Sequence, residues 1–222
     1  MKQTAPEDAY LDTLRDRLYS AVLSDVLDQL GFRNQAMAAR LRPLWQEAVL
    51  VGRAHTALTV DIVEVRPDPY RGEIEAVDSL KAGDVMVAAT GPSTRTCFWG
   101  ELLATAARGH GARGAVVDGY VRDVRRIRQM DFPVFTTGMS PVDSAGRSIV
   151  VECGTTVMCG DVVVHEGDLV FGDVDGIVVV PREAEEEAVR RALEKVAGED
   201  RTRAALEQGM TLTEVYAKYG VI

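Results

Sequence analysis

Apolar residues near the amino end of the chain recur at intervals of three and four, which is the spacing of one helix face. The stripe consists of Leu11, Leu14, Leu18, Val22, Val26 and Leu30. It predicts a helix over residues 7–30 that ends at Gly31, with Ser24 as a position where an internal cap is able to restart the turn. A β-branched run then predicts a strand over residues 49–65, and residues 73–83 have the spacing of a short helix.

The middle of the chain alternates buried apolar runs with segments of helical spacing. The runs predict strands over residues 84–90, 113–119 and 132–138. The segments between them predict helices over residues 98–111 and 121–130. Strand, helix, strand, helix, strand in this order is typical of a parallel βαβαβ core, so the expected fold class is α/β.

From about Ser148 the pattern changes to short β segments that are separated by Gly-Asp pairs. These pairs are Gly160-Asp161, Gly167-Asp168 and Gly172-Asp173. Asp175-Gly176 is a strong hairpin signal between two apolar runs. We therefore expect this part of the chain to be mostly antiparallel.

The carboxyl end of the chain returns to helical spacing. Helical stretches are predicted over residues 182–198 and 199–209, and a closing turn carries the capping-box residues Thr211 and Glu214. No low-complexity linker separates these stretches from the β segments. We expect a single domain over residues 1–222 with a helical tail over about 182–222.

Composition excludes several classes of partner. The 222 residues carry a formal net charge of −9, whereas binding to nucleic acid or to an anionic membrane needs a positive field. No apolar run reaches the length of a membrane span, and residues 1–18 are too polar for a signal peptide. Cys97, Cys153 and Cys159 form no CxxC pair, so we expect free thiols and a cytoplasmic location. The histidines are far apart and form no HxxxH pattern, so we do not expect a histidine-rich zinc site.

Two predicted helix starts carry the candidate chemistry. Gly100 and Glu101 open the first helix, and the free backbone N–H groups from Gly100 to Leu103, including Leu102, form a site for a small anion. Asp123 suits the start of the next helix, but Arg122 opposes the helix dipole and needs another partner. The loops of consecutive βα units meet at one edge of a parallel sheet, so we expect these residues to converge.

The converging groups are suited to a metal ion and an organic acid. Two carboxylates, Glu101 and Asp123, fit a hard divalent cation such as Mg²⁺ or Mn²⁺. The planar fork of Arg122 fits a carboxylate. The competing interpretation is that Glu101 only satisfies the helix dipole and that Arg122 only forms a salt bridge with an acid.

These residues belong to segments that resemble the RraA-like family. The segments include "GDVMVAATG", "WGELLATAARGHGARGAVVDGYVRD" and "GDLVFGDVDGIVVVP", and the resemblance extends to "SDVLDQLG" and "GRAHTALTV". The family includes metal-dependent 4-hydroxy-4-methyl-2-oxoglutarate / 4-carboxy-4-hydroxy-2-oxoadipate aldolases and regulators of ribonuclease activity. The resemblance implies an RraA-like layered β/β/α fold.

The aldolase branch of this family has an acid, twenty intervening residues, an Arg-Asp pair, two residues and another acid. Glu101 and the pair Arg122-Asp123 match this spacing, with Glu where Asp is usual. The last acid is replaced by Arg126, which alters the outer part of the site. The regulator branch typically lacks the Asp of the pair, so Asp123 favours an enzyme.

The resemblance implies a class II pyruvate aldolase that cleaves a 4-hydroxy-2-oxo diacid, such as 4-hydroxy-4-methyl-2-oxoglutarate, to pyruvate and a second 2-oxo acid. Oxaloacetate decarboxylation is the expected side activity. Asp123 would anchor Mg²⁺ or Mn²⁺, Glu101 would hold water on the metal, and Arg122 would contact the carboxylate and oxo end of the substrate. The amides of Leu102 and Leu103 would take the pyruvyl carboxylate.

In the aldolases an acid from the tail of a neighbouring subunit completes the metal's outer shell. Glu199 is the candidate in this chain, and the adjacent Asp200 is the alternative. This arrangement implies a homotrimer or a hexamer with its sites at subunit interfaces. The alternative function is a non-catalytic RraA-like regulator that binds a ribonuclease.

Overall fold

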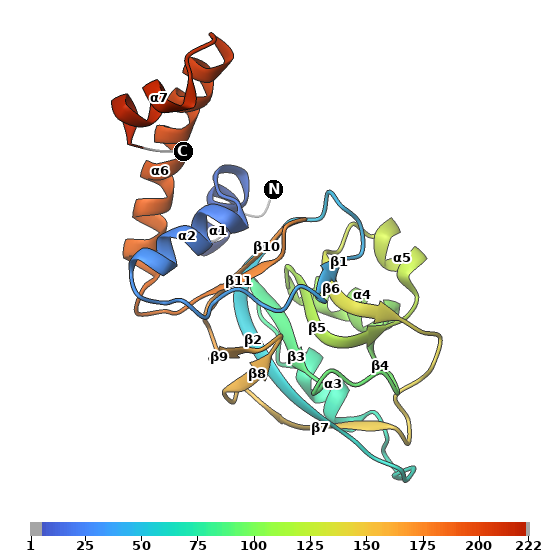
Figure 1. The fold of residues 1–222 in the computed structure, drawn as a ribbon. Helices are drawn as coiled ribbons and strands as arrows, with labels where there is room; N and C mark the ends of the chain where they lie inside the picture. The colour runs from blue at the N-terminus through green and yellow to red at the C-terminus, as the bar shows by residue number, and fades with distance from the viewer. Residues whose placement is uncertain (1–5, 221–222) are drawn as a thin grey trace.

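A nine-stranded mixed sheet forms the centre of the structure, a computed structural model that describes residues 6–220 (Figure 1). The prediction that residues 1–18 are not a signal peptide includes residues 1–5, which lie outside the described residues. Seven strands follow one another across the sheet in the order β1-β6-β5-β3-β2-β10-β11. Two more strands join this path, since β4 pairs with β5 and β7 pairs with β2. The observed mixed α/β fold, with parallel core strands, an antiparallel section and C-terminal helices, is the predicted one.

The predicted βαβαβ core is present, with strand β3 (Asp84–Ala89), helix α4 (Glu101–His110), strand β5 (Gly114–Val121), helix α5 (Val124–Gln129) and strand β6 (Val134–Met139). Strand β5 pairs in parallel with both β3 and β6. The predicted strand over residues 49–65 is β2 (Leu50–Asp61), which extends the parallel part of the sheet by pairing with β3. Residues 73–83 contain the end of helix α3 (Arg71–Asp78).

The predicted antiparallel section is also present. It consists of β7 (Ser148–Cys153), β8 (Val157–Cys159), β9 (Val162–Val164), β10 (Leu169–Gly172) and β11 (Ile177–Val180). The Asp175-Gly176 hairpin joins β10 to β11, and β10 then pairs antiparallel with β2. Strands β8 and β9 form a separate hairpin, and the short strand β1 (Arg42–Pro43) pairs antiparallel with β6.

The amino-terminal prediction of one helix was wrong, because the chain forms α1 (Pro6–Arg17) and α2 (Ser20–Gln29). The new helix starts at Ser20 and not at Ser24. The backbone N–H and the hydroxyl of Ser20 donate to the two carboxylate oxygens of Asp173, at 2.7 and 2.6 Å. Because Asp173 belongs to the turn between β10 and β11, the local sequence near residue 20 does not reveal this cap.

The tail was predicted as two helical stretches, but residues 185–207 form one continuous helix, α6 (Glu185–Glu207). Gly198 lies on the buried side of α6, in line with Thr202 and Ala205. Packing of this face stabilises the helix across the glycine, whose intrinsic cost is only about 1 kcal/mol. Helix α7 (Leu212–Tyr219) follows, and its start has the predicted capping box of Thr211 and Glu214.

Three buried clusters show how the layers pack around the sheet. Helices α3, α4 and α5 cover one face, where Ala76, Ala104 and Ile127 meet alternate residues of the parallel strands. The β8–β9 hairpin packs on the opposite face. Helices α1, α2 and α6 gather at the β10–β11 end of the sheet, away from β4 and α5 (Figure 1). Within residues 6–220, no helix is long and apolar enough to cross a membrane.

Candidate active site

Strand β4 (Cys97–Trp99) places the two candidate helix starts next to each other. Phe98 and Trp99 were predicted as part of the first turn of a helix. This was wrong, because Cys97 and Trp99 pair in parallel with the end of β5 and the helix begins only at Glu101. In the register Trp99 lies opposite Val121, and the N–H of Arg122 donates to the carbonyl of Trp99 at 2.9 Å. The residues after the two strands therefore leave the sheet side by side.

Gly100 allows this close approach. A Cβ at this position would lie 2.9 Å from Oδ2 of Asp123 and 3.2 Å from Cγ of Arg122. The backbone of Gly100 is extended, with φ −148° and ψ −177°, so the glycine serves the contact and not an unusual conformation. Asp123 itself has φ 59°, a left-handed conformation that aspartate tolerates better than most residues. This conformation turns the chain from β5 into α5, a helix that starts at Val124 and not at residue 121 as predicted.

Gly100, Arg122 and Asp123 line one cavity of about 420 Å³, together with Leu102 and Leu103. The cavity also takes in Tyr70 and Glu73 from the region of α3, and Asp143 and Ser144 from the loop after β6. The predicted convergence of the two helix starts is therefore observed. Of the residues predicted for the site, Glu101 contributes its backbone N–H, which donates to Oδ2 of Asp123 at 3.3 Å.

The Glu101 side chain points to its own helix. Its Oε1 accepts a hydrogen bond from the hydroxyl of Thr105, one turn further along, at 3.2 Å. The first helical bond of α4 runs from the N–H of Ala104 to the carbonyl of Gly100, so the N–H groups of Leu102 and Leu103 have no acceptor within the helix. These two amides are the groups that the sequence predicted to bind a small anion, and they are free of helical acceptors.

Arg122 has the partner that the sequence called for. Its guanidinium Nη1 lies 2.9 Å from Oδ1 of Asp143, and its Nε lies 3.6 Å from Oδ2 of Asp123. The competing interpretation, that Arg122 forms a salt bridge with an acid, is thus also correct. The salt bridge does not exclude a role in the site, because the ion pair lies at the cavity. Burial acts to raise the pKa of Asp143, but the Tyr70 hydroxyl, which donates to it at 2.5 Å, and the Arg122 guanidinium together hold that pKa below its usual value.

Glu73 is the residue that the sequence reasoning missed. Its side chain is only 6% exposed, and Oε1 has no hydrogen-bond partner among residues 6–220. Burial, opposed by the Ser144 hydroxyl, raises the pKa of Glu73 to about 7. A signal was present, because Glu73 lies three and four residues before the buried Ala76 and Val77, so an acid occupies the apolar face of α3.

The donor set allows a loosely held divalent cation. The described residues contain no group of three or more His, Cys, Asp or Glu side chains that could enclose a metal ion. The side chain of Asp123 is 46% exposed and lines the cavity. Glu101 is the first residue of α4, directly after Gly100, which also lines the cavity. One or two carboxylates with water and substrate as the remaining ligands is the usual environment of Mg²⁺. The residues therefore fit Mg²⁺ or Mn²⁺ held mainly by Asp123.

Glu199 lies in α6, on the far side of the chain from this cavity (Figure 1). Its carboxylate accepts a hydrogen bond from the hydroxyl of Tyr19 and lies 3.8 Å from Nζ of Lys195. Asp200, the alternative, pairs with Arg203 at 2.6 Å. Their contribution to a neighbouring subunit, and the trimer or hexamer that it implies, stay predictions.

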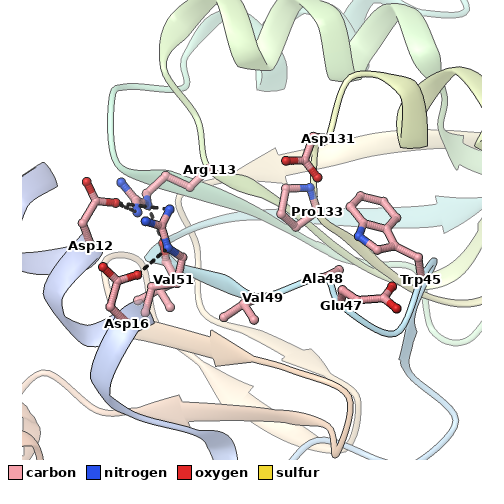
Figure 2. A pocket seen from close by; sticks show the side chains of 11 residues that line it. Asp12, Asp16, Trp45, Glu47, Ala48, Val49, Val51, Arg113, Asp131 and Pro133 are labelled. Atoms are coloured by element: carbon pink, nitrogen blue, oxygen red, sulfur yellow. Dashed lines mark hydrogen bonds and ion pairs between the residues drawn. The ribbon is translucent and has the colours of Figure 1, made fainter.

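A second cavity, of about 540 Å³, opens at the amino ends of the parallel strands (Figure 2). Figure 2 shows Arg113 beside Asp12 at one end of it, and Trp45 with Glu47 at the other. The Arg113 guanidinium donates to Asp12 Oδ1 and, at 2.7 Å, to the carbonyl of Val51. The Arg113 guanidinium is thus occupied by contacts that hold α1 against the sheet. This cavity is therefore the weaker candidate for a reactive site.

His55, Ser79 and Glu166 form a contact that resembles a hydrolase triad. The two ring nitrogens of His55 lie 2.9 Å from Glu166 Oε1 and 2.8 Å from Ser79 Oγ. The Ser79 hydroxyl, however, donates to the carbonyl of Ala76 at 2.8 Å. The serine hydroxyl is therefore committed to a backbone carbonyl, and the hydrogen bond to Glu166 raises the pKa of His55. The cluster is a histidine–carboxylate contact and not an activated serine.

Comparisons with known proteins found related sequences and structures. A sequence model described as "RraA-like: Aldolase/RraA" matches residues 20–179. A protein of Halalkalibacterium halodurans named "Putative 4-hydroxy-4-methyl-2-oxoglutarate aldolase" is 29% identical over 195 residues, which are 87% of each chain. DlpA of Legionella pneumophila is 28% identical over 200 residues, which cover 90% of this chain but only 32% of DlpA.

Among solved structures, the chain is similar to Streptomyces coelicolor RraAS2, described as an unusual member of the RNase ES inhibitor RraA protein family. The TM-score is 0.79 at 28% sequence identity, and the match covers 90% of this chain and 98% of RraAS2.

Proposed function

This chain belongs to the RraA-like family, and from that premise we propose that it is a divalent-metal-dependent aldolase acting on a 4-hydroxy-2-oxo diacid. The products would be pyruvate and a second 2-oxo acid, and oxaloacetate decarboxylation would be a side activity. One observation carries the proposal: the start of α4, Arg122 and Asp123 meet in a single cavity. The aldolase name of the H. halodurans relative supports it.

The cavity offers two ways to hold the carboxylate end of a 2-oxo acid. The N–H groups of Leu102 and Leu103 point out of the first turn of α4, where the helix dipole favours negative charge. Arg122 adds a planar fork of donors and is held in place by Asp143 at 2.9 Å. The Arg122 side chain is still about one-third exposed, so a substrate anion can reach it.

The reaction needs positive charge where electrons accumulate. Breaking the carbon–carbon bond β to a ketone moves an electron pair toward the ketone oxygen and produces the enolate of pyruvate. A divalent cation, when bound at Asp123, supplies positive charge beside that oxygen. Arg122 stabilises the same developing charge from the protein side. Loss of CO₂ from oxaloacetate uses the same electron sink, which is why we expect both activities.

The test measures pyruvate with a coupled dehydrogenase, using oxaloacetate or 4-hydroxy-4-methyl-2-oxoglutarate with Mg²⁺, in the presence and absence of EDTA. We expect pyruvate release that EDTA abolishes. Arg122→Ala should lower turnover on the order of a hundred- to a thousandfold, and Arg122→Lys should recover little because it lacks the bidentate fork. Arg128→Ala, which removes an exposed arginine of α5, is the matched control and should behave like wild type.

Turnover by Arg122→Ala that equals the control would contradict the assignment. No pyruvate from either substrate would favour the alternative function, a regulator that binds a ribonuclease. The similarity to RraAS2, described as a member of an RNase ES inhibitor family, is the observation behind that alternative. Asp123 favours the enzyme, because it supplies the carboxylate for the cation.

A further inference from the structure

The proposed chemistry needs a group that moves a proton, and the cavity contains a side chain that the roles above leave unused. Glu73 lines the cavity from the first turn of α3. It is 6% exposed, and Oε1 meets no partner within the part of the chain that the structure describes. A buried carboxylate with one oxygen that accepts no hydrogen bond is costly, so this group binds a proton readily.

The charged and titratable groups around Glu73 set the direction of this effect. Burial raises its pKa to about 7, and the negative charge of Asp143 adds to the rise. The Ser144 hydroxyl and the Arg122 guanidinium oppose it. Glu73 is thus able to gain and lose a proton near neutral pH, as a general acid–base group must.

The other groups of the cavity are less suited to this task. Asp143 is held as a carboxylate by Arg122 and by the Tyr70 hydroxyl. The thiol of Cys97 donates to the carbonyl of Ser140 at 2.9 Å, and burial raises its pKa. The pKa values of the two carboxyl groups in this cavity are therefore shifted in opposite directions, upward for Glu73 and downward for Asp143, because their surroundings differ. This arrangement separates acid–base groups from charge-bearing ones.

We propose that Glu73 is the proton carrier of this site: it takes the proton of the substrate's C4 hydroxyl and delivers it to C3 of the pyruvate enolate. This inference rests on the proposed function, because it assigns a residue to a step of that reaction. The second cavity and the His55 cluster offer no comparable buried group. Asp12 is paired with Arg113, Glu47 and Asp131 are exposed, and Glu166 is paired with the imidazole of His55.

The proton and the electrons balance over one turnover. The Glu73 carboxylate accepts the hydroxyl proton, and the O–H electron pair becomes the second bond of the new carbonyl at C4. The C3–C4 bond breaks and its pair forms the C2–C3 double bond, while the C2 carbonyl pair moves to oxygen. Protonated Glu73 then gives its proton to C3, the C2 carbonyl re-forms, and the carboxylate is restored. No other oxidant, reductant or base is required.

Two measurements on the metal-loaded enzyme distinguish the loss of proton transfer from the loss of enolate stabilisation. The first is exchange of the pyruvate methyl protons with D₂O, followed by ¹H NMR, which requires a group that protonates and deprotonates C3. The second is CO₂ release from oxaloacetate, in which the bond breaks without removal of a proton. In Glu73→Gln we expect exchange and aldol cleavage to fall by about 10²- to 10⁴-fold, with CO₂ release within about tenfold of wild type.

Glu75→Gln is the matched control on the same helix, because Glu75 is exposed and pairs with Arg71 at 2.8 Å. It should exchange pyruvate protons at the wild-type rate. Glu73→Asp retains a carboxyl group and should recover part of the exchange. The wild-type exchange rate should rise with pH through about 7, and this dependence should be absent from Glu73→Gln.

Exchange by folded Glu73→Gln at the wild-type rate would overturn the assignment while leaving the proposed function intact. A wild-type enzyme that neither releases CO₂ nor exchanges protons would refute both. If Glu73→Gln does not fold, infrared titration of the metal-free wild-type protein decides the matter. A protonated carboxyl band that titrates near pH 7 supports the proton carrier, and its absence above pH 5 overturns it.

Discussion

Gly100→Ala tests whether the site depends on the close packing of the two helix starts. The new Cβ would lie 2.9 Å from Oδ2 of Asp123, 3.2 Å from Cγ of Arg122 and 3.3 Å from its Nε. Ordinary contact of a Cβ begins at 3.4 Å, so the Asp123 carboxylate must move by about half an ångström. The backbone need not change, because alanine readily adopts the extended conformation of Gly100.

The expected effect is on activity and not on folding. A misplacement of about 1 Å in a catalytic constellation costs on the order of a hundredfold in rate, so a shift of half that size should cost roughly tenfold. Because Asp123 and Arg122 move together, both the apparent affinity for Mg²⁺ and kcat/KM for oxaloacetate should fall. The measurement is EDTA-sensitive pyruvate release at several Mg²⁺ concentrations, with thermal unfolding recorded on the same samples.

Gly109→Ala is the control, since a Cβ at Gly109 would meet nothing within 4 Å. Gly109 lies within α4, so alanine should stabilise the protein by up to about 1 kcal/mol and leave activity unchanged. If Gly100→Ala matches Gly109→Ala in both Mg²⁺ dependence and kcat/KM, the contact among these residues is not part of a catalytic site, and the reasoning from the cavity fails.

Two further predictions concern the metal and the dependence of stability on pH. In calorimetric titration of the metal-free protein, Asp123→Asn should abolish saturable Mg²⁺ binding. Glu101→Gln should weaken Mg²⁺ binding by about ten- to a hundredfold, as expected for a group that acts through water. Unchanged Mg²⁺ binding by Asp123→Asn would exclude Asp123 as the anchor of the metal. The hydrogen bond that His55 donates to the Glu166 carboxylate raises the pKa of His55 above its ordinary 6.5. The stabilising contribution of this pair is therefore complete below about pH 6.5 and is lost as the pH rises through the higher pKa of the folded protein. The free energy of unfolding should therefore fall above pH 6.5 in the wild type and less steeply in His55→Gln, measured by urea denaturation at a series of pH values; equal slopes would show that the pair does not titrate in this range.

Local patterns in the sequence were sufficient for much of the fold. The alternation of β3, α4, β5, α5 and β6 follows from apolar periodicity, because each strand and each helix must bury one face against the sheet. The same patterns indicated that Gly100, Arg122 and Asp123 follow the carboxyl ends of neighbouring strands. The family resemblance then gave these residues an expected chemistry, and their convergence in one cavity was confirmed.

The errors occurred where a distant residue determines the local structure. Phe98 and Trp99 begin a segment with helical spacing, but the pairing of Cys97 and Trp99 with the end of β5 makes residues 97–99 a strand. Ser20 starts α2 because Asp173, more than 150 residues later in the chain, accepts its hydrogen bonds. In both cases the residue that determines the local structure belongs to another segment of the chain. The periodicity of one segment does not reveal which other segment it contacts.

By itself, the sequence determined the alternating elements of the parallel core and the charged residues that stand at their helix starts, because those depend on neighbours within a few positions. Only the tertiary structure decided the surroundings of each charge. It brought Asp143 from the loop after β6 to Arg122, and it enclosed Glu73 in the same cavity. Protonation and ion pairing depend on burial and on charges across space, and those are properties of the packed chain.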